Sequence, residues 1–181
     1  CHKNNLVVSV DNPVPEDFTS HYDRKEQGLV VDYVIIMGYD EHYVGSDAGS
    51  VASLPWVEQG VQDTIAEVTP ERTILAIPFY TRLWKTTGGA VTSEAIGMDE
   101  AQNVLSTNGV EAVWDGSVGQ NYATFEQDNS TYQIWLEDAQ SIAEKVKLIQ
   151  KYNLAGVAQW KLGFENSSIW QTISDNLQAA S

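Results

Sequence analysis

Four short apolar segments constrain the fold more than any other feature of this sequence. They are residues 6–10, 30–37, 74–77 and 156–160, and each has the length and β-branched content of a buried strand. None alternates polar and apolar residues cleanly, which is typical of strands covered on both faces in a parallel sheet. Helical patterns separate the segments, so the sequence predicts an α/β fold.

Three helices are expected beside these strands. Ser53 and Pro55 precede an apolar stripe at helical spacing that runs from Trp56 to Val68. Ser141 and Glu144 fit a capping box at the start of a second helix. A third helix is predicted over residues 169–177.

Residues 84–135 interrupt the alternation of strands and helices. A Thr/Gly-rich stretch is followed by a predicted helix over 99–107 and by strands over 110–114, 121–125 and 131–136. The polar segment 126–130 has the length of a hairpin turn. We interpret 84–135 as a small α+β insertion in one fold unit, between strands and helices in 1–83 and the last strand and helices in 136–181.

Charge and composition exclude several classes of function. Ten basic and 25 acidic residues give a formal charge of −15, which repels nucleic acids and anionic membranes. No apolar run approaches the roughly 18 residues of a membrane span. One cysteine and three scattered histidines exclude a disulfide framework and give no zinc spacing. We therefore expect no nucleic-acid partner, no membrane span and no metal.

The ends of the predicted strands favour part of a barrel over a nucleotide-binding open sheet. Four strands are too few to close an eight-stranded barrel but enough for an open sheet. A nucleotide-binding open sheet would carry a glycine-rich loop after its first strand, where this chain has Asp11-Asn12-Pro13-Val14-Pro15. Polar and aromatic residues follow Met37 and end the strand at Trp160, and barrels place their chemistry at the carboxyl ends of strands.

Three motifs in order resemble glycoside hydrolase family 18, of the bacterial peptidoglycan and spore-cortex N-acetylglucosaminidase type. Residues 31–40 are similar to the family's sixth strand with its Met-x-Tyr-Asp end, residues 74–84 to the seventh and residues 155–163 to the eighth. The segment Trp135-Leu136-Glu137-Asp138 before the next helix adds to the likeness. The resemblance implies strands five to eight, the C-terminal half of a TIM (β/α)8 barrel, with a small α+β insertion after strand seven.

The resemblance does not extend to the family's acid-catalyst motif. The family's acid catalyst belongs to an Asp-x-x-Asp-x-Asp-x-Glu motif at the end of the fourth strand, and these 181 residues contain no such run. By this mapping the chain begins in the helix before strand five. We expect the chain alone to be inactive, and its partners to include the missing N-terminal half or a second copy that covers the open strand edges.

The family's activity gives the functional expectation. It implies retaining hydrolysis of β-1,4-linked N-acetylglucosamine polymers, either peptidoglycan or chitin, in which the substrate's acetamido group attacks and no cofactor takes part. The expected location is extracellular, in the cell envelope or in the spore. The alternative is a non-catalytic carbohydrate-binding half-barrel, and the two differ in whether the coding sequence upstream of Cys1 encodes the acid motif.

The resemblance assigns roles to particular residues. Tyr39 and Asp40 are the expected catalytic pair: Tyr39 donates a hydrogen bond to the acetamido oxygen and Asp40 binds the same sugar. Trp160 is expected to form the floor on which the sugar ring stacks. The other candidate substrate-binding residues are Arg82, Trp84, Trp114, Glu137 and Asp138.

Structural roles compete with several of these assignments. Tyr39 and Asp40 could be a hydrogen-bonded structural pair, and Trp160 could belong to the core. Arg82 has the alternative of an ion pair in so acidic a chain. Glu137 and Asp138 could simply cap the helix that follows them, because an acidic side chain suits a helix N-terminus.

Overall fold

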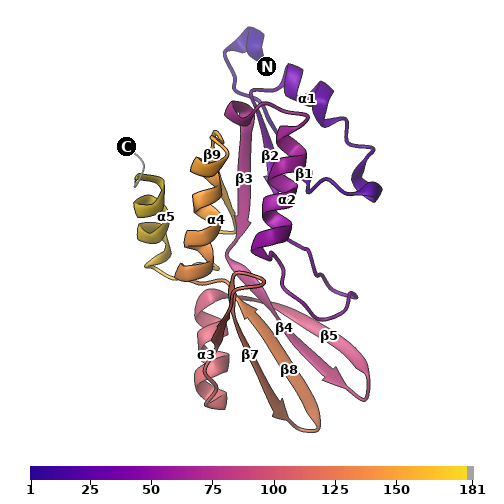
Figure 1. The fold of residues 1–181 in the computed structure, drawn as a ribbon, viewed down its shortest axis with the longest axis vertical. Helices are drawn as coiled ribbons and strands as arrows, with labels where there is room; N and C mark the ends of the chain where they lie inside the picture. The colour runs from indigo at the N-terminus through magenta and orange to yellow at the C-terminus, as the bar shows by residue number, and fades with distance from the viewer. Residues whose placement is uncertain (179–181) are drawn as a thin grey trace.

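The computed structural model describes residues 1–178, which form two sheets flanked by helices (Figure 1). The first sheet is parallel, with strand order β1-β2-β3-β9. Its strands are β1 (Ser9–Pro13), β2 (Tyr33–Met37), β3 (Thr73–Pro78) and β9 (Gly156–Trp160). The second sheet is antiparallel, with strand order β5-β4-β8-β7-β6, and lies beyond the carboxyl ends of the parallel strands (Figure 1). Its strands are β4 (Tyr80–Thr87), β5 (Ala90–Gly97), β6 (Val113–Asp115), β7 (Gln120–Gln127) and β8 (Ser130–Leu136).

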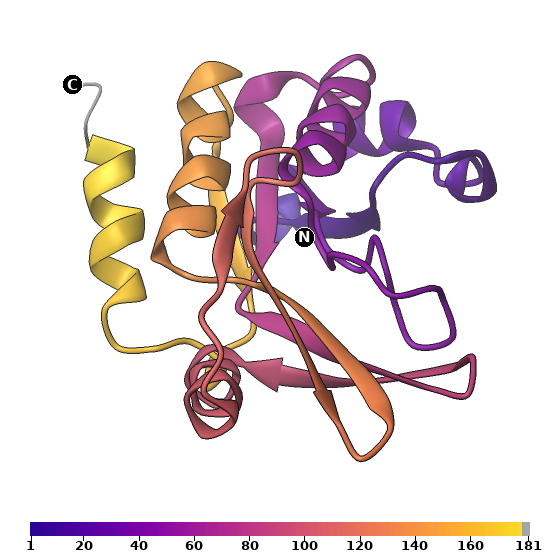
Figure 2. The ribbon, with the colours of Figure 1, turned by 60° about the horizontal axis from the view of Figure 1, so that its bottom comes forward.

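The α-helices are α1 (Arg24–Val30), α2 (Leu54–Ile65), α3 (Met98–Asn108), α4 (Ala139–Lys151) and α5 (Ile169–Gln178). Short 3-10 turns occupy His2–Asn4, Asp17–Thr19 and Pro70–Arg72. Helices α1, α2 and α4 pack on one face of the parallel sheet, α5 packs on α4, and α3 packs on the antiparallel sheet (Figures 1 and 2). Within residues 1–178 the opposite face of the parallel sheet carries no helix.

The core lies between the parallel sheet and its helices. The register pairs Ile36 with Leu75 and Leu75 with Val157, so these side chains point to the same face. Ile36 and Leu75 are at most 1% exposed and pack with Val57 and Val61 of α2. Alternate residues of the same strands point away from the helices and are more accessible. Burial is therefore one-sided.

The α/β fold is as predicted, but the parallel sheet is open. In the described part of the chain it has four strands, and β1 and β9 each have one strand neighbour only. The strands do not close into a barrel.

Two strand boundaries predicted from hydrophobicity are wrong. The first strand begins at Ser9 instead of residue 6, and Leu6 and Val7 are 57% and 74% exposed. The second begins at Tyr33 instead of residue 30, because α1 extends to Val30. Both errors have one cause: exposed apolar residues precede each strand and lengthen the apolar run without joining the sheet.

The capping box predicted at Ser141 is displaced by one helical turn. Helix α4 begins at Ala139, and its N-cap is Asp138, whose carboxylate accepts hydrogen bonds from the amides of Gln140 and Ser141. The Ser141 hydroxyl in turn accepts a hydrogen bond from the Asp138 amide. Ser141 is therefore the third helical residue of the box and not its first.

The antiparallel sheet contains a hairpin that the sequence analysis does not identify. Strands β4 and β5 pair along eight residues each, and Gly88 and Gly89 turn the chain between them with φ of 56° and 86°. Positive φ at both turn positions is typical of two-residue hairpin loops, where glycine is favoured. The Thr/Gly-rich composition of this stretch is consistent with the turn, but it gave no apolar pattern from which the two strands could be predicted.

Candidate functional site

Tyr39 and Asp40 stand directly after strand β2, at the carboxyl edge of the parallel sheet. Gly38 lets the chain pass close to β3: a Cβ on Gly38 would lie 2.9 Å from Leu75 Cδ1 and 3.0 Å from the Ala76 carbonyl oxygen. Asp40 has a φ of 66°, in the left-handed region that few residues other than Gly, Asn and Asp adopt. Backbone strain of this kind is often found at functional sites.

The Tyr39 hydroxyl is a proton donor over a wide pH range. Partial burial, followed by the nearby carboxylates of Asp11 and Asp40, raises the pKa of Tyr39 to about 12. Ionisation would place a third negative charge beside two others, so the phenol stays protonated. Tyr39 can therefore donate a hydrogen bond to a neutral oxygen.

Tyr80, the first residue of β4, is a site residue that the sequence analysis missed. Its hydroxyl donates a hydrogen bond to Oδ1 of Asp40, and its ring meets the Tyr39 ring edge to face at 6.2 Å between centroids. Burial, and then the hydrogen bond to Asp40, raise the pKa of Tyr80 well above its usual range. Tyr80 falls inside the motif 74–84, but only its position beside the Asp40 carboxylate gives it a role.

Two adjoining hollows meet at Asp40. One, of about 190 Å³, is lined by Asp40, Tyr80, Arg82, Ala95, Trp160 and Phe164. The other, of about 250 Å³, is mostly apolar and is lined by Pro13, Val14, Glu16, Phe18, Met37, Tyr39, Asp40, Tyr43 and Trp56. The structure thus brings together Tyr39, Asp40, Arg82 and Trp160, which come from distant parts of the sequence.

Trp160 and Arg82 are both available to a ligand. Trp160 ends β9 on the face without helices and is 53% exposed, so it is not a core residue. Arg82 donates from Nη1 to Ser93 Oγ at 3.1 Å, while its buried Nε has no hydrogen-bond partner. Among residues 1–178 Arg82 forms no ion pair. Its guanidinium lines the smaller hollow and is not in direct contact with a carboxylate.

Trp84 does not line the site, contrary to expectation. Its side chain is 1% exposed, and its indole nitrogen donates to the carbonyl oxygen of Gly49 at 2.9 Å. It instead fixes the long loop between β2 and α2 to the antiparallel sheet. Trp114 is half-buried on edge strand β6 and lines neither of the two hollows.

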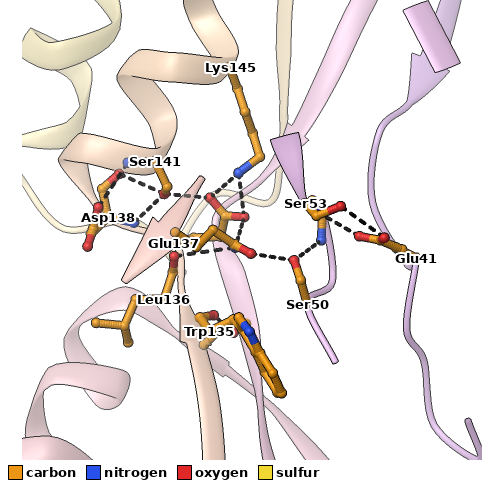
Figure 3. Close-up of polar contacts among 12 residues, drawn as sticks. Glu41, Ser50, Ser53, Trp135, Leu136, Glu137, Asp138, Ser141 and Lys145 are labelled. Carbon is orange, nitrogen blue, oxygen red and sulfur yellow. Dashed lines mark hydrogen bonds and ion pairs between the residues drawn. The ribbon is translucent and has the colours of Figure 1, made fainter. Parts of the chain in front are cut away.

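Glu137 and Asp138 have interior and capping positions. Glu137 is completely buried, and the Lys145 ammonium lies 2.9 Å from its Oε1 and 3.0 Å from its Oε2 (Figure 3). Burial raises the pKa of Glu137, and Lys145 opposes that rise. Asp138 caps α4 and receives a hydrogen bond from Asn121. Neither acid reaches the two hollows, so the geometry does not support Glu137 and Asp138 as sugar contacts. The alternative role as a helix cap fits Asp138.

Nowhere in residues 1–178 do three or more His, Cys, Asp or Glu side chains gather in a way that could hold a metal ion. None of the helices in that range has the length and hydrophobicity needed to cross a bilayer.

The aromatic and acidic residues thus lie at the carboxyl ends of parallel strands, where enzymes with β/α barrels carry their active sites. The family model "Glycosyl hydrolases family 18" matches residues 2–165. The chain belongs to this family of glycosidases.

Curated relatives and solved structures agree with this assignment. The uncharacterized glycosylase YvbX of Bacillus subtilis is 26% identical over 159 residues, and the cortical fragment-lytic enzyme of the same organism is 26% identical over 157 residues. These alignments cover 87% and 85% of this chain but 46% and 36% of the relatives, so the chain spans less than half of each.

Solved structures give the same fold. A chitinase from Chromobacterium violaceum superposes with a TM-score of 0.90 at 25% identity, covering 98% of this chain and 57% of that one. The spore cortex-lytic enzyme SleL of Bacillus megaterium superposes with a TM-score of 0.86 at 23% identity, covering 97% of this chain and 42% of that one. The fold is therefore that of part of a family 18 domain.

Proposed function

We propose that this chain is the sugar-stabilising part of a glycosidase that hydrolyses β-1,4-linked N-acetylglucosamine polymers with retention of configuration. The observation that carries the proposal is the convergence of Tyr39, Asp40, Arg82 and Trp160 on two hollows that share Asp40. Relatives named as cortical fragment-lytic enzymes and chitinases support this class of glycan. Peptidoglycan is the favoured polymer, and chitin is the alternative.

In the proposed mechanism the substrate's own acetamido oxygen attacks the anomeric carbon. Tyr39 donates its phenol proton in a hydrogen bond to that acetamido oxygen, which the raised pKa keeps possible at any physiological pH. Asp40 contacts the same sugar, and the hydroxyl of Tyr80 holds its carboxylate in one orientation. Fixing the oxygen against the anomeric carbon supplies the proximity that the reaction needs.

Trp160 and Arg82 bind and orient the glycan. The exposed indole of Trp160 offers a flat surface for the C–H face of a sugar ring. Of the five N–H donors of Arg82, one on Nη1 bonds Ser93 and the buried Nε–H is unpaired, so the remaining donors on the Nη atoms are available to a neighbouring part of the glycan. No cofactor takes part in this scheme.

Protonation of the leaving oxygen is the step for which this sequence has no assigned residue. The family's acid motif does not occur in the 181 residues, and loss of a general acid lowers rate by a factor of roughly 10² to 10⁴. We propose that the chain alone binds glycan without cleaving it, and that hydrolysis requires a segment that supplies the acid. The proposed place of action is the spore or cell wall.

The test is turnover of a chromogenic N-acetylglucosaminide by the purified chain. We expect no activity above that of Tyr39→Phe, together with measurable binding of an N-acetylglucosamine tetrasaccharide. Turnover by the chain that Tyr39→Phe abolishes would contradict the proposed dependence on another segment. Absence of tetrasaccharide binding would contradict the sugar site itself.

A carbohydrate-binding module without catalysis is the second candidate. The exposed face of Trp160 and the absence of the acid motif from these 181 residues favour a binding module as much as they favour part of an enzyme. The two candidates differ when the acid-bearing segment is supplied: an enzyme then gains turnover, and in it Tyr39→Phe lowers kcat far more than it raises KM. A binding module gains none.

A further inference from the structure

A completely buried ion pair lies between the two sheets and outside both hollows. Glu137 follows β8, Lys145 lies in α4, and neither side chain is exposed to any extent. Replacing such a pair with apolar residues is often neutral or stabilising, because removing two charges from water is costly. Stability alone is therefore a weak explanation for the pair, and its other partners are informative.

The Glu137 carboxylate accepts two more hydrogen bonds, one on each side. Ser141 Oγ donates to Oε2 at 2.8 Å, within α4. Gln120 Nε2 donates to Oε1 at 2.8 Å, from the first residue of β7. Gln120 is itself 0% exposed, so its side chain has no access to water. The carboxylate thus connects helix α4 with the antiparallel sheet.

The ion pair also determines which way the Gln120 amide points. An ionised carboxylate only accepts hydrogen bonds, so the NH₂ group of Gln120 faces Glu137, where it also donates to the Leu136 carbonyl oxygen at the longer distance of 3.4 Å. The carbonyl oxygen of Gln120 must then face away, and there it accepts a hydrogen bond from Ser50 Oγ. Ser50 Oγ accepts in turn from the Ala52 amide at 3.0 Å (Figure 3).

Ser50 belongs to the loop of residues 38–53, which begins at the proposed sugar contacts. The His42 amide donates to the Ser50 carbonyl oxygen at 3.2 Å, two residues after Asp40. The Glu41 amide donates to Val51 O at 3.0 Å, and the Glu41 carboxylate accepts from the amide and hydroxyl of Ser53 at 2.7 and 2.9 Å (Figure 3). The two ends of the loop are therefore tied together, and Ser50 is held from outside by Gln120.

We propose that Gln120 is a positioning residue: the Glu137–Lys145 pair orients its amide, and its carbonyl oxygen then holds Ser50 and with it the loop that carries Tyr39 and Asp40. The consequence for sugar binding rests on the proposed function, whereas the consequence for the loop does not. Gln120 itself touches neither hollow.

The test compares two variants that each remove one hydrogen bond to the same carboxylate. Gln120→Met keeps the length of the side chain and loses the connection to Ser50. Ser141→Ala loses the bond within α4 and leaves that connection in place. The measurements are hydrogen exchange at the amides of Glu41 and His42, thermal melting, and affinity for an N-acetylglucosamine tetrasaccharide.

We expect Gln120→Met to increase exchange at the two loop amides at least tenfold and to weaken tetrasaccharide binding about tenfold. Ser141→Ala should lower the melting temperature while loop exchange and affinity stay within twofold of the parent chain. Glu137→Gln combined with Lys145→Met removes both charges and leaves the Leu136 carbonyl oxygen to orient the Gln120 amide, so it should reproduce part of the loop opening.

Ser50→Ala provides a milder change that preserves folding if Gln120→Met does not. It removes the same hydrogen bond from the loop side and should give the same opening, with no further increase when combined with Gln120→Met. Unchanged loop exchange in folded Ser50→Ala, or equal opening in Ser141→Ala, would overturn the proposal. Loop opening as expected in a chain that binds no tetrasaccharide would support the positioning role and refute the proposed function.

Discussion

The two faces of the parallel sheet differ more than any other two regions of the molecule. On the face that α1, α2 and α4 cover, Val34, Leu75 and Ile77 have no exposed surface. On the opposite face Ala76 and Pro78 of β3 are buried, but the side chains of the other three strands are at least partly accessible, and Trp160 is 53% exposed. Parallel sheets are almost always covered on both faces. The comparison indicates that the helix-covered face supplies most of the core that stabilises this chain, whereas the opposite face keeps more of its surface exposed.

The largest expected difference between the faces is in stability. Leu75→Ala, on the covered face, should lower the free energy of unfolding by about 2–5 kcal/mol, because it leaves a cavity in the core. Ile74→Ala is the matched variant: it changes the adjacent residue of β3, which points to the open face and is half-buried. We expect it to cost about 1 kcal/mol or less.

Urea unfolding of the two variants measures this difference. A loss in Ile74→Ala as large as that in Leu75→Ala would mean that the open face is covered in solution.

The next effect concerns association. Strands β1 and β9 have free edges, and such edges present unpaired backbone donors and acceptors to another chain. We expect the purified chain to form dimers at micromolar concentration in sedimentation velocity experiments. A single 20 kDa species with a cooperative melt would refute this and would show that the four-stranded sheet is stable with open edges.

The smallest effect appears only at high pH. The pKa of Tyr39 is raised from 10 to about 12, so its protonated form is favoured in the folded chain. The resulting contribution to stability is complete below pH 10 and is lost as pH rises from 10 toward 12. An absorbance titration at 295 nm should show two tyrosines fewer, Tyr39 and Tyr80, ionising near pH 10 than in the unfolded chain. If the titration of Tyr39→Phe differs from that of the parent near pH 10, Tyr39 has an ordinary pKa.

The sequence predicts this fold best where apolar segments are continuous. The residues of β9 are the predicted 156–160, and α5 begins at the predicted residue 169. Prediction fails where apolar residues are exposed, as at Leu6 and Val7, and where glycines hide a hairpin, as at Gly88 and Gly89. Hydrophobic pattern alone does not distinguish an apolar residue in a sheet from one in solvent.

The site could be predicted only in part, because the roles of several residues depend on contacts between distant segments of the chain. Motif positions identified Tyr39, Asp40, Arg82 and Trp160, which meet at the two hollows. The same reasoning placed Trp84 and Glu137 beside a sugar, although both side chains are buried and line neither hollow. Tyr80 was missed because its role depends on contact with Asp40, forty residues away in the sequence. Such roles follow from tertiary contacts, which one sequence does not display.

Calorimetric titration with an N-acetylglucosamine tetrasaccharide tests the central claim that the two hollows that meet at Asp40 bind glycan. The parent chain should bind with measurable affinity, Trp160→Ala should abolish that binding, and Trp114→Ala, which removes an indole outside the two hollows, should bind like the parent. Equal losses in the two tryptophan variants, or no binding by the parent chain, would contradict the account.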